Sequence, residues 1–339
     1  MRKEIEKRLS DVENTGIFTV SLDFELYWGM FDKIVLEDYK ENLAGVHQVV
    51  PRMLNLFEEY GIHVTWATVG LLFFKDYSEM IENLPKIRPN YTEKQISAYN
   101  YIDKNNHTSI DTKFHYASSL INKIKQTPFQ EIGTHTFSHY YCLEEGQSTE
   151  SFQEDLNAAI EVANKKNIPI KSIVFPRNQV NQEYLQVCLE HGIAAYRGTE
   201  NVFIYNAEEE DKKNTPIKRI LRLLDAYFNI FGHNTYALSK VSEEKIINIP
   251  ASRFYRPYSR RLRKLEPLKI NRILNDMEYA AKRSEIYHLW WHPHNFGGDI
   301  EENIKNLQLI LEKFKFLKEK YNMRSLNMGE ISNEVKKLQ

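Results

Sequence analysis

Two carboxylates stand two positions apart in the stretch VSLDFELYWG at residues 20–29. Apolar and polar side chains alternate from Ile17 onward, which is typical of a β-strand with one face against the core. Asp23 and Glu25 are therefore expected on the same face of this strand. Like charges held this close repel each other unless a cation lies between them or one of them keeps its proton. The pair predicts a positive partner from elsewhere in the chain.

The segment EIGTHTFSHYYC at 131–142 contains His135 and His139, four positions apart. On a helical turn, imidazoles at this spacing point to one side, as in helical zinc motifs. One such pair is unsurprising among eleven histidines, and most isolated pairs are unrelated side chains. Together with a carboxylate from the strand end, however, the pair forms a two-histidine, one-carboxylate set. Such a set suits zinc or another divalent metal with an open position for water.

Two further histidines, His292 and His294, follow an apolar strand in YHLWWHPHNFGG at 287–298. A histidine-rich turn without chemistry is the simpler interpretation. The functional interpretation is a general acid close to a metal-bound nucleophile, since a histidine titrates near neutral pH. We favour the functional interpretation. Either histidine could donate the proton, and His292 is closer to the strand end.

Arg177 follows a predicted strand in VFPRNQ at 174–179. Here its guanidinium could orient a carboxylate through a charge-assisted hydrogen bond. An exposed surface arginine is an equally good interpretation of the same residue.

A basic run, ASRFYRPYSRRLRK, occupies residues 251–264. Such runs are usually solvated helix faces. Aromatic residues are interleaved with this one, and it follows a predicted strand. Arg253 and Arg256 could therefore hold a phosphate or another anionic part of a substrate. The preceding stretch at 217–232, IKRILRLLDAYFNIFG, is basic and amphipathic. We expect it to pack on the rest of the protein, the alternative being a membrane surface.

Strands alternating with helices must position these residues. We expect strands at 17–26, 62–70, 129–135, 170–176, 193–199, 246–252 and 285–292, and helices at 41–60, 150–166, 181–191, 266–284 and 299–320. This alternation predicts a parallel sheet with helical crossovers, and about seven such units favour a closed or nearly closed β/α barrel. We expect one domain over 1–339, with a helical extension at 1–15 and an insertion of short helices and loops around 72–128.

Parallel barrels carry their chemistry at the C-terminal ends of the strands. The predicted ends hold most of the candidate residues, namely Asp23, Glu25, His135, Arg177, Arg197, Arg253, His292 and His294. The sequence therefore predicts that metal ligands and acid–base groups converge at one mouth.

Composition excludes several classes of protein. The 339 residues carry a formal net charge of -1, which does not indicate a nucleic-acid binder. Two cysteines, Cys142 and Cys188, form neither a disulfide framework nor a cysteine-rich zinc site, and they suit a reducing compartment. The longest apolar stretch, at 64–74, is too short to span a bilayer, and the N-terminus lacks the apolar segment of a signal peptide. We therefore expect a cytoplasmic protein with no transmembrane segment.

These motifs together resemble the polysaccharide deacetylases, a superfamily of metal-dependent carbohydrate esterases that includes chitin-oligosaccharide and peptidoglycan deacetylases. The run HTFSH at 135–139 matches the metal motif H-[ST]-x-x-H of that family. The segments DFE, VFPRNQ and LWWHPH resemble its acidic, Arg-Pro and Leu-x-His motifs, and TWATVG and RSLNMGEI also look like the family. The combination LDFELYWG, FPRNQ and WWHPHNF is most similar to members associated with surface-polysaccharide biosynthesis.

The chain departs from the family pattern in three places. The usual adjacent Asp-Asp is here Asp23-Phe24-Glu25, the Arg-Pro order is reversed to Pro176-Arg177, and an Asp-Trp motif has no clear equivalent.

The resemblance implies a distorted seven-stranded β/α barrel that removes an acetyl group from an N-acetylated sugar or polysaccharide precursor. It implies a divalent metal, with zinc expected, held by Glu25, His135 and His139, and it implies that Asp23 is the catalytic base. Either His292 or His294 is the implied acid, and Arg177 completes the catalytic set. The residues expected to contact substrate are Trp28, Trp291, Arg253 and Arg256.

Two other functions remain open on the sequence. A related C–N hydrolase acting on a small cyclic amide or formamide would use the same site. An inactive metal-containing module that binds glycans would retain it without turnover. For the deacetylase, the basic run at 251–264 favours a phosphate-bearing substrate, either nucleotide-linked or lipid-linked.

Overall fold

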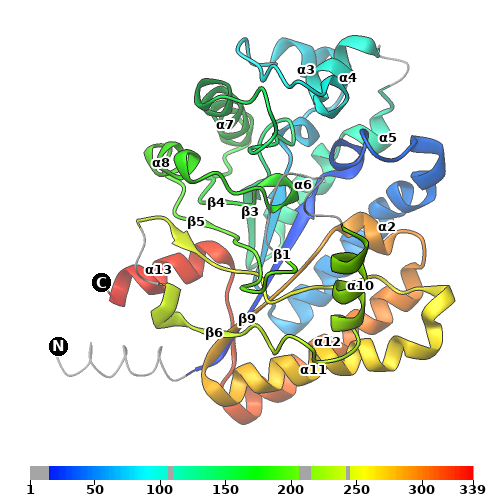
Figure 1. Ribbon diagram of the computed structural model, residues 1–339, viewed down its shortest axis with the longest axis vertical. Helices are drawn as coiled ribbons and strands as arrows, with labels where there is room; N and C mark the ends of the chain where they lie inside the picture. The colour runs from blue at the N-terminus through cyan, green and yellow to red at the C-terminus, as the bar shows by residue number, and fades with distance from the viewer. Residues whose placement is uncertain (1–14, 106–109, 206–214, 242–244, 339) are drawn as a thin grey trace.

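The computed structural model describes residues 15–105, 110–205, 215–241 and 245–338. The extension expected at 1–15 therefore lies, apart from Thr15, outside the described residues. Figure 1 shows a curled sheet in the middle of the molecule with helices packed around its outside.

The central strand of this sheet is β1 (Ile17–Phe24), which pairs in parallel with β2 (Val64–Thr68) and β9 (Glu285–Trp291). The strand order is β6-β9-β1-β2-β3-β4-β5-β7, and β8 and β10 pair with β9 and β1. Their bounds are β3 (Gln130–Thr134), β4 (Ser172–Ile173), β5 (Ala195–Tyr196), β6 (Tyr236–Ala237), β7 (Ile247–Asn248), β8 (Arg253–Phe254) and β10 (Arg324–Ser325). In this order only β6 is antiparallel to its neighbour. The sheet is a curled, mostly parallel half-barrel, which confirms the expected β/α barrel class.

Each of the seven expected strands is present, but β4, β5 and β7 are only two residues long. Pro176 and Pro250 follow closely after β4 and β7. A proline has no N–H to donate, so it cannot continue a hydrogen-bonded ladder. The short strands β6, β8 and β10 were not expected from the sequence.

Helices cover the outside of the sheet. The longest is α2 (Leu36–Tyr60), which starts earlier than expected and ends at Gly61, whose φ of 63° lies in the left-handed region that favours glycine. The other long helices are α7 (Thr149–Asn164), α8 (Gln182–Glu190), α11 (Glu266–Arg283), α12 (Ile300–Tyr321) and α13 (Met328–Leu338). Residues 72–128 contain the short helices α3 (Tyr77–Glu82), α4 (Ala98–Lys104), α5 (Thr112–His115) and α6 (Ser118–Gln126).

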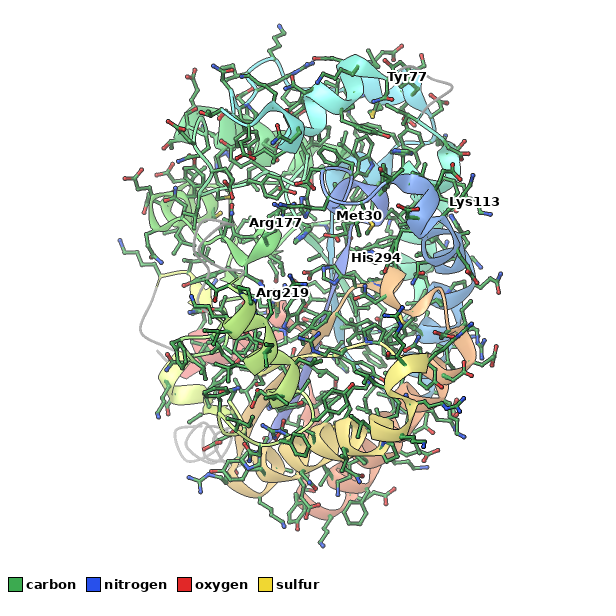
Figure 2. The ribbon with its side chains drawn as sticks, turned by 45° about the vertical axis from the view of Figure 1, so that its right-hand side comes forward. Met30, Tyr77, Lys113, Arg177, Arg219 and His294 are labelled. Atoms are coloured by element: carbon green, nitrogen blue, oxygen red, sulfur yellow. The ribbon has the colours of Figure 1, made fainter. Side chains whose placement is uncertain are left out.

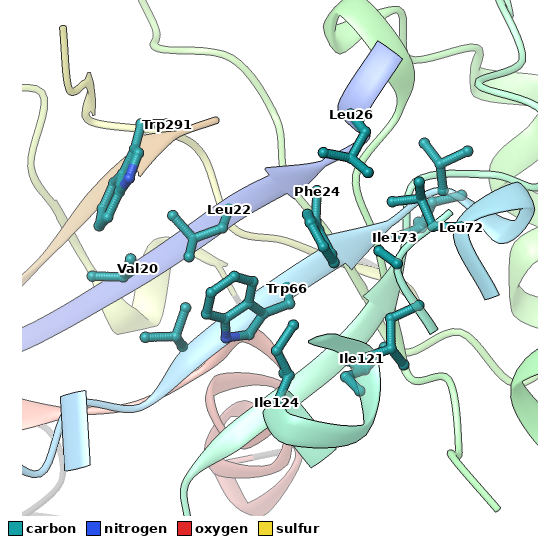
Figure 3. Close-up of a cluster of buried hydrophobic side chains, with 14 of the residues drawn as sticks. Val20, Leu22, Phe24, Leu26, Trp66, Leu72, Ile121, Ile124, Ile173 and Trp291 are labelled. Atoms are coloured by element: carbon teal, nitrogen blue, oxygen red, sulfur yellow. The ribbon is translucent and has the colours of Figure 1, made fainter. Parts of the chain in front are cut away.

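One face of β1 packs in the hydrophobic core, and the other faces the interior of the half-barrel. Figure 3 shows Val20, Leu22 and Phe24 of β1 in one cluster with Trp66 of β2 and Trp291 of β9. Alternate residues of a strand point to opposite faces. The apolar side chains therefore turn one face of β1 towards the helices, and Ser21 and Asp23 point into the interior of the half-barrel.

The segment at 217–232 does not pack as expected. It contains α10 (Pro216–Asp225), whose apolar side chains Ile217, Ile220 and Leu224 are exposed. The expectation that this stretch packs its apolar face on the rest of the protein is therefore wrong. Within the described residues, no helix is both long enough and apolar enough to cross a membrane.

Candidate active site

The C-terminal ends of the parallel strands bring together side chains that are far apart in sequence. Asp23 lies near the end of β1, His135 follows β3, Arg197 follows β5, and His292 follows β9. In the view of Figure 2, Met30, Arg177 and His294 lie around this end of the sheet, and Arg219 of α10 lies below them. The predicted convergence at one mouth is therefore seen in the structure for most of the candidates.

Glu25, His135 and His139 form a buried cluster. One carboxylate oxygen of Glu25, Oε2, is 3.3 Å from Nε2 of His135 and 3.2 Å from Nε2 of His139. One potential ligand atom from each residue lies within 4.8 Å of the others. Burial alone would raise the pKa of Glu25, but His292, His135 and His139 together hold it well below its ordinary value.

The hydrogen bonds of the histidines show that this cluster fits a metal ion. Nδ1 of His135 is 2.8 Å from the carbonyl oxygen of Val174, which can only accept, so Nδ1 carries the proton. In a neutral ring, the Nε2 lone pair of His135 then faces the Glu25 carboxylate. Two electron-rich groups in contact need a cation between them, and neutral histidine plus carboxylate is a usual donor set for zinc. Nδ1 of His139 is buried without a hydrogen-bond partner among the described side chains.

The segment that carries the two histidines is an irregular turn, so their convergence does not come from the spacing of a helical turn. Thr136 and His139 have φ values of 62° and 59°, in the left-handed region. The turn is held by the carboxylate of Asp155, whose Oδ1 accepts a 2.6 Å hydrogen bond from the backbone N–H of Phe137. Its Oδ2 accepts from the hydroxyls of Ser138 and Tyr99.

Sequence reasoning missed Asp155, although a signal was present. On the amphipathic helix α7, Asp155 interrupts the buried apolar face formed by Phe152, Leu156 and Ala159. A charged residue on the buried face of a helix needs a partner, because its desolvation is otherwise costly.

Asp23 is held by an arginine. Its two carboxylate oxygens accept hydrogen bonds of 2.7 and 2.8 Å from Nη1 and Nη2 of Arg197, and the Arg197 side chain is completely buried. Arg197 also donates to Ser21 and Asn178, each at 3.0 Å, and lies 4.1 Å from the ring of Trp290. Burial opposes ionisation of Asp23, but Arg197 outweighs it and lowers the pKa of this carboxyl.

His292 faces both carboxylates. Its Nε2 is 3.8 Å from Oδ2 of Asp23 and 3.6 Å from Oε1 of Glu25, and its side chain is 23% exposed. His294 lies behind it, with the two rings stacked at a centroid distance of 5.0 Å. Burial lowers the pKa of His294 to about 3, so its ring is neutral at ordinary pH. The geometry therefore favours His292 as the proton donor.

Arg177 does not contact Asp23. It pairs with Asp32 at 2.6 Å and lies 4.2 Å from the ring of Tyr141. It therefore orients a carboxylate, as the sequence suggested, but not the candidate base. The arginine that orients the candidate base is Arg197, which the sequence placed at a strand end but to which no role was assigned.

Three of the four residues expected to contact substrate are buried elsewhere. Arg253 is bound to Asp276 at 2.8 Å and to the carbonyl of Asp225 at 3.0 Å. Trp28 and Trp291 are completely buried, and the Trp28 indole donates to the backbone of His115. The fourth, Arg256, is partly buried and lies 5.9 Å from the ring of Phe254.

The aromatic residue that does face the site is Trp290. Residues 288, 290 and 292 alternate with 289 and 291 along β9, so Trp290 shares the interior face with His292. It is only partly buried, and its ring lies 5.6 Å from the ring of His292. Phe254 of β8 stands beside it at 4.7 Å.

Comparison with known proteins agrees with these motifs. A family model described as polysaccharide deacetylase matches residues 30–196, a range that includes His135 and His139 but neither β1 nor β9. No curated protein matches the chain. The predicted resemblance to polysaccharide deacetylases is therefore confirmed.

Solved structures show the same fold at low sequence identity. A candidate polysaccharide deacetylase from Mycobacterium smegmatis has a TM-score of 0.57 and 12% identity, over 95% of this chain and 91% of that chain. The allantoinase PuuE has a TM-score of 0.51 and 11% identity, over 95% and 90% of the two chains. A 4-alpha-glucanotransferase from Thermococcus litoralis has a TM-score of 0.52 and 11% identity, over 94% of this chain and 40% of that chain.

Proposed function

The chain matches the polysaccharide deacetylase family model over residues 30–196, and from this premise we propose that the chain is a metal-dependent hydrolase that removes an acetyl group from an N-acetylated sugar. One observation carries the proposal. Asp23, fixed by Arg197, lies beside the Glu25–His135–His139 cluster, and Nε2 of His292 faces both carboxylates within 3.8 Å. A base, a metal-binding set and an acid therefore share one site.

The residues of this site divide the work. When bound to Glu25, His135 and His139, a divalent metal would lower the pKa of a water molecule and polarise the acyl carbonyl. The Asp23 carboxylate takes the proton of the attacking water, and the Arg197 fork keeps that carboxylate ionised and oriented. Protonated His292 then gives its Nε2 proton to the amide nitrogen as the C–N bond breaks, so that acetate and the free amine leave.

The sugar ring is proposed to lie against the partly buried aromatic faces next to His292. Trp290 and Phe254 form this wall, with Glu200 3.5 Å from the indole nitrogen of Trp290. An apolar ring face combined with a few polar groups is the usual composition of a small-molecule site. Trp290 thus takes the substrate-binding role that the sequence analysis gave to Trp28 and Trp291.

We also propose that the substrate carries a phosphate, although fewer basic residues are free to bind it than the sequence suggested. Arg253 is committed to Asp225 and Asp276 and is not open to an anion. Arg261 and Arg263 of the 3-10 helix η6 (Arg260–Leu265) are exposed and could still contact an anion, whereas Arg260 is paired with Asp299 at 2.7 Å. We also propose a cytoplasmic location, for which the two free, buried cysteines are the supporting observation.

The test combines metal analysis with product analysis on a panel of N-acetylated nucleotide sugars, N-acetylated oligosaccharides and small cyclic amides. We expect about one equivalent of divalent metal per chain and acetate release from at least one sugar. Hydrolysis of only the cyclic amides would favour the rival C–N hydrolase. Glycan binding without product, under every divalent metal tried, would favour an inactive module.

A further inference from the structure

Helix α10 turns its apolar side to the solvent. Ile217, Ile220, Leu223 and Leu224, together with Phe228 and Ile230 just after the helix, are between 39% and 71% exposed. We call these six residues the α10 apolar face. Ile217, Ile220 and Leu224 follow the spacing i, i+3, i+7 and so form a continuous stripe along one side of the helix. Contiguous exposed apolar patches on soluble proteins usually mark interaction sites.

The opposite side of α10 is polar and is anchored to the protein. Asp225, at the end of the helix, is completely buried and accepts hydrogen bonds from Nη1 of Arg253, the hydroxyl of Tyr205 and the backbone N–H of Phe231. Asp225 is the only residue of the helix that is buried. The anchoring of this carboxylate fixes the rotation of α10, so the outward direction of its apolar side chains is built into the fold.

Positive charge borders the α10 apolar face. The charges of the helix itself are basic: α10 carries Lys218, Arg219 and Arg222, and its one acidic residue is the buried Asp225. Arg219 is exposed and has no ion-pair partner among the described side chains.

We propose that the α10 apolar face is a membrane-docking surface that binds an anionic phospholipid bilayer. An amphipathic helix with a basic border lies in the plane of such a bilayer, with its apolar side chains among the acyl chains and its cations at the headgroups. The α10 helix is ten residues long, which suits binding at the surface and not insertion across the bilayer.

The anchor of α10 is next to the wall of the candidate active site. Arg253, which holds Asp225, is followed in β8 by Phe254, and the Phe254 ring lies 5.8 Å from that of His292. If the proposed deacetylase function holds, a bilayer bound at α10 would favour a substrate carried on a lipid. The docking itself does not depend on that function.

The test measures binding of the full chain to sedimenting vesicles, without any sugar substrate. One set contains equal parts phosphatidylglycerol and phosphatidylcholine, and the other contains phosphatidylcholine alone. We expect binding to the anionic vesicles to be at least about tenfold stronger, and to weaken as salt is added. Equal binding to both sets, or no binding to the anionic set, would overturn the proposal.

Variants distinguish binding through the α10 apolar face from nonspecific adsorption to the vesicles. The double variant Ile217→Ser/Ile220→Ser should lose most of the binding, and Arg219→Glu should reduce it several-fold. The matched control is Leu309→Ser/Phe316→Ser, which removes two similarly exposed apolar side chains from α12 and should bind as wild type does. If instead the α10 double variant binds like wild type, the proposal fails.

A second copy of the chain is the competing occupant. Sedimentation velocity of the wild type without lipid should show a monomer. A dimer that dissociates in Ile217→Ser/Ile220→Ser would assign the surface to self-association and overturn the membrane proposal. Acetate release from a water-soluble substrate should be unchanged in the variants, so that failure of the docking proposal and failure of the deacetylase proposal are distinguishable.

Discussion

Asp23 and Arg197 meet inside the half-barrel through two parallel N–H···O hydrogen bonds of 2.7 and 2.8 Å. They come from β1 and from the end of β5, and three strands separate β1 from β5 in the sheet. Strands four places apart bring side chains into contact only when the sheet curls, because neighbouring strands are about 4.8 Å apart. The two hydrogen bonds between Arg197 and Asp23 can therefore form only because the sheet is curved.

Replacing Arg197 tests whether the fork orients the base. In Arg197→Lys the charge is kept but two parallel hydrogen bonds can no longer form. We expect kcat for acetate release to fall by about a hundredfold, as is typical of a misplaced catalytic group. Arg197→Ala should instead destabilise the protein by about 3–5 kcal/mol, because a buried carboxylate is left unpaired. A fully active Arg197→Lys enzyme would show that the orientation of Asp23 is not needed.

Replacing Asp23 tests its role as the base. Asp23→Asn keeps the shape of the side chain but removes the group that accepts a proton. We expect turnover to be lost while the bound metal, measured by elemental analysis, stays near one equivalent, because Asp23 is outside the Glu25–His135–His139 cluster. An active Asp23→Asn protein would refute the assignment. Loss of metal together with activity would make Asp23 a ligand.

The sequence predicts which residues belong to this site better than it predicts which of them pair with each other. Strand-end positions and motif spacing placed Asp23, His135 and His292 at one mouth, because those properties are local. The partner of Asp23 was not predictable, since Arg197 is 174 positions away and reaches it only through the curl of the sheet. Arg177, closer to a family motif, pairs with Asp32 instead.

The alternation of side chains along a strand explains why Trp291 and Arg253, which were expected to contact substrate, do not face the site. Trp291 and Trp290 are neighbours in sequence, but adjacent strand residues face opposite sides, and the pairing of β9 with β1 decides which one enters the site. Trp290 is paired with Ser21 on the interior face, and Trp291 with Leu22 on the helix-facing side. Arg253 is on the helix-facing side for the same reason, because it pairs with Leu289.

The two candidate acids can be distinguished by mutation. His292→Asn should lower kcat by about 10²–10⁴, the usual contribution of a general acid, with little change in stability because the side chain is partly exposed. His294→Asn should act mainly on stability, since His294 is buried and its ring is neutral. Acetate release and urea unfolding measured on both variants check this. The reverse pattern would make His294 the donor.

Removal of a metal ligand tests the cluster. Glu25→Gln keeps the size of the side chain but removes its charge, so we expect metal affinity to fall by more than the roughly 10–100-fold that loss of an outer partner costs. Competition with a fluorescent chelator measures this. Glu131→Gln is the matched control, because it makes the same substitution at a glutamate outside the cluster. The Glu131 carboxylate accepts hydrogen bonds from the hydroxyls of Thr65 and Ser172, and burial raises its pKa, in contrast to that of Glu25. Equal metal affinity in Glu25→Gln and wild type would refute the ligand assignment.

Buried neutral histidines predict how stability depends on pH. Burial lowers the pKa of His115 to about 4 and that of His288 to about 3. Both are completely buried. In the unfolded chain each has a pKa near 6.5, so the unfolded state binds protons first as the pH falls. The stabilisation is therefore complete above about pH 6.5 and is lost below it, by about 2 kcal/mol for each histidine at pH 5.

Urea unfolding of the metal-free protein at pH 7 and pH 5 measures this effect. The wild-type free energy of unfolding should be lower at pH 5. In His115→Gln, which lies away from the metal cluster and bonds the carbonyl of Asp111, the fall should be smaller by about 2 kcal/mol because one titrating group is gone. His191→Gln, a partly exposed position, should show the wild-type fall. An unchanged fall in His115→Gln would mean that His115 does not contribute, and the acid sensitivity would then come from other groups.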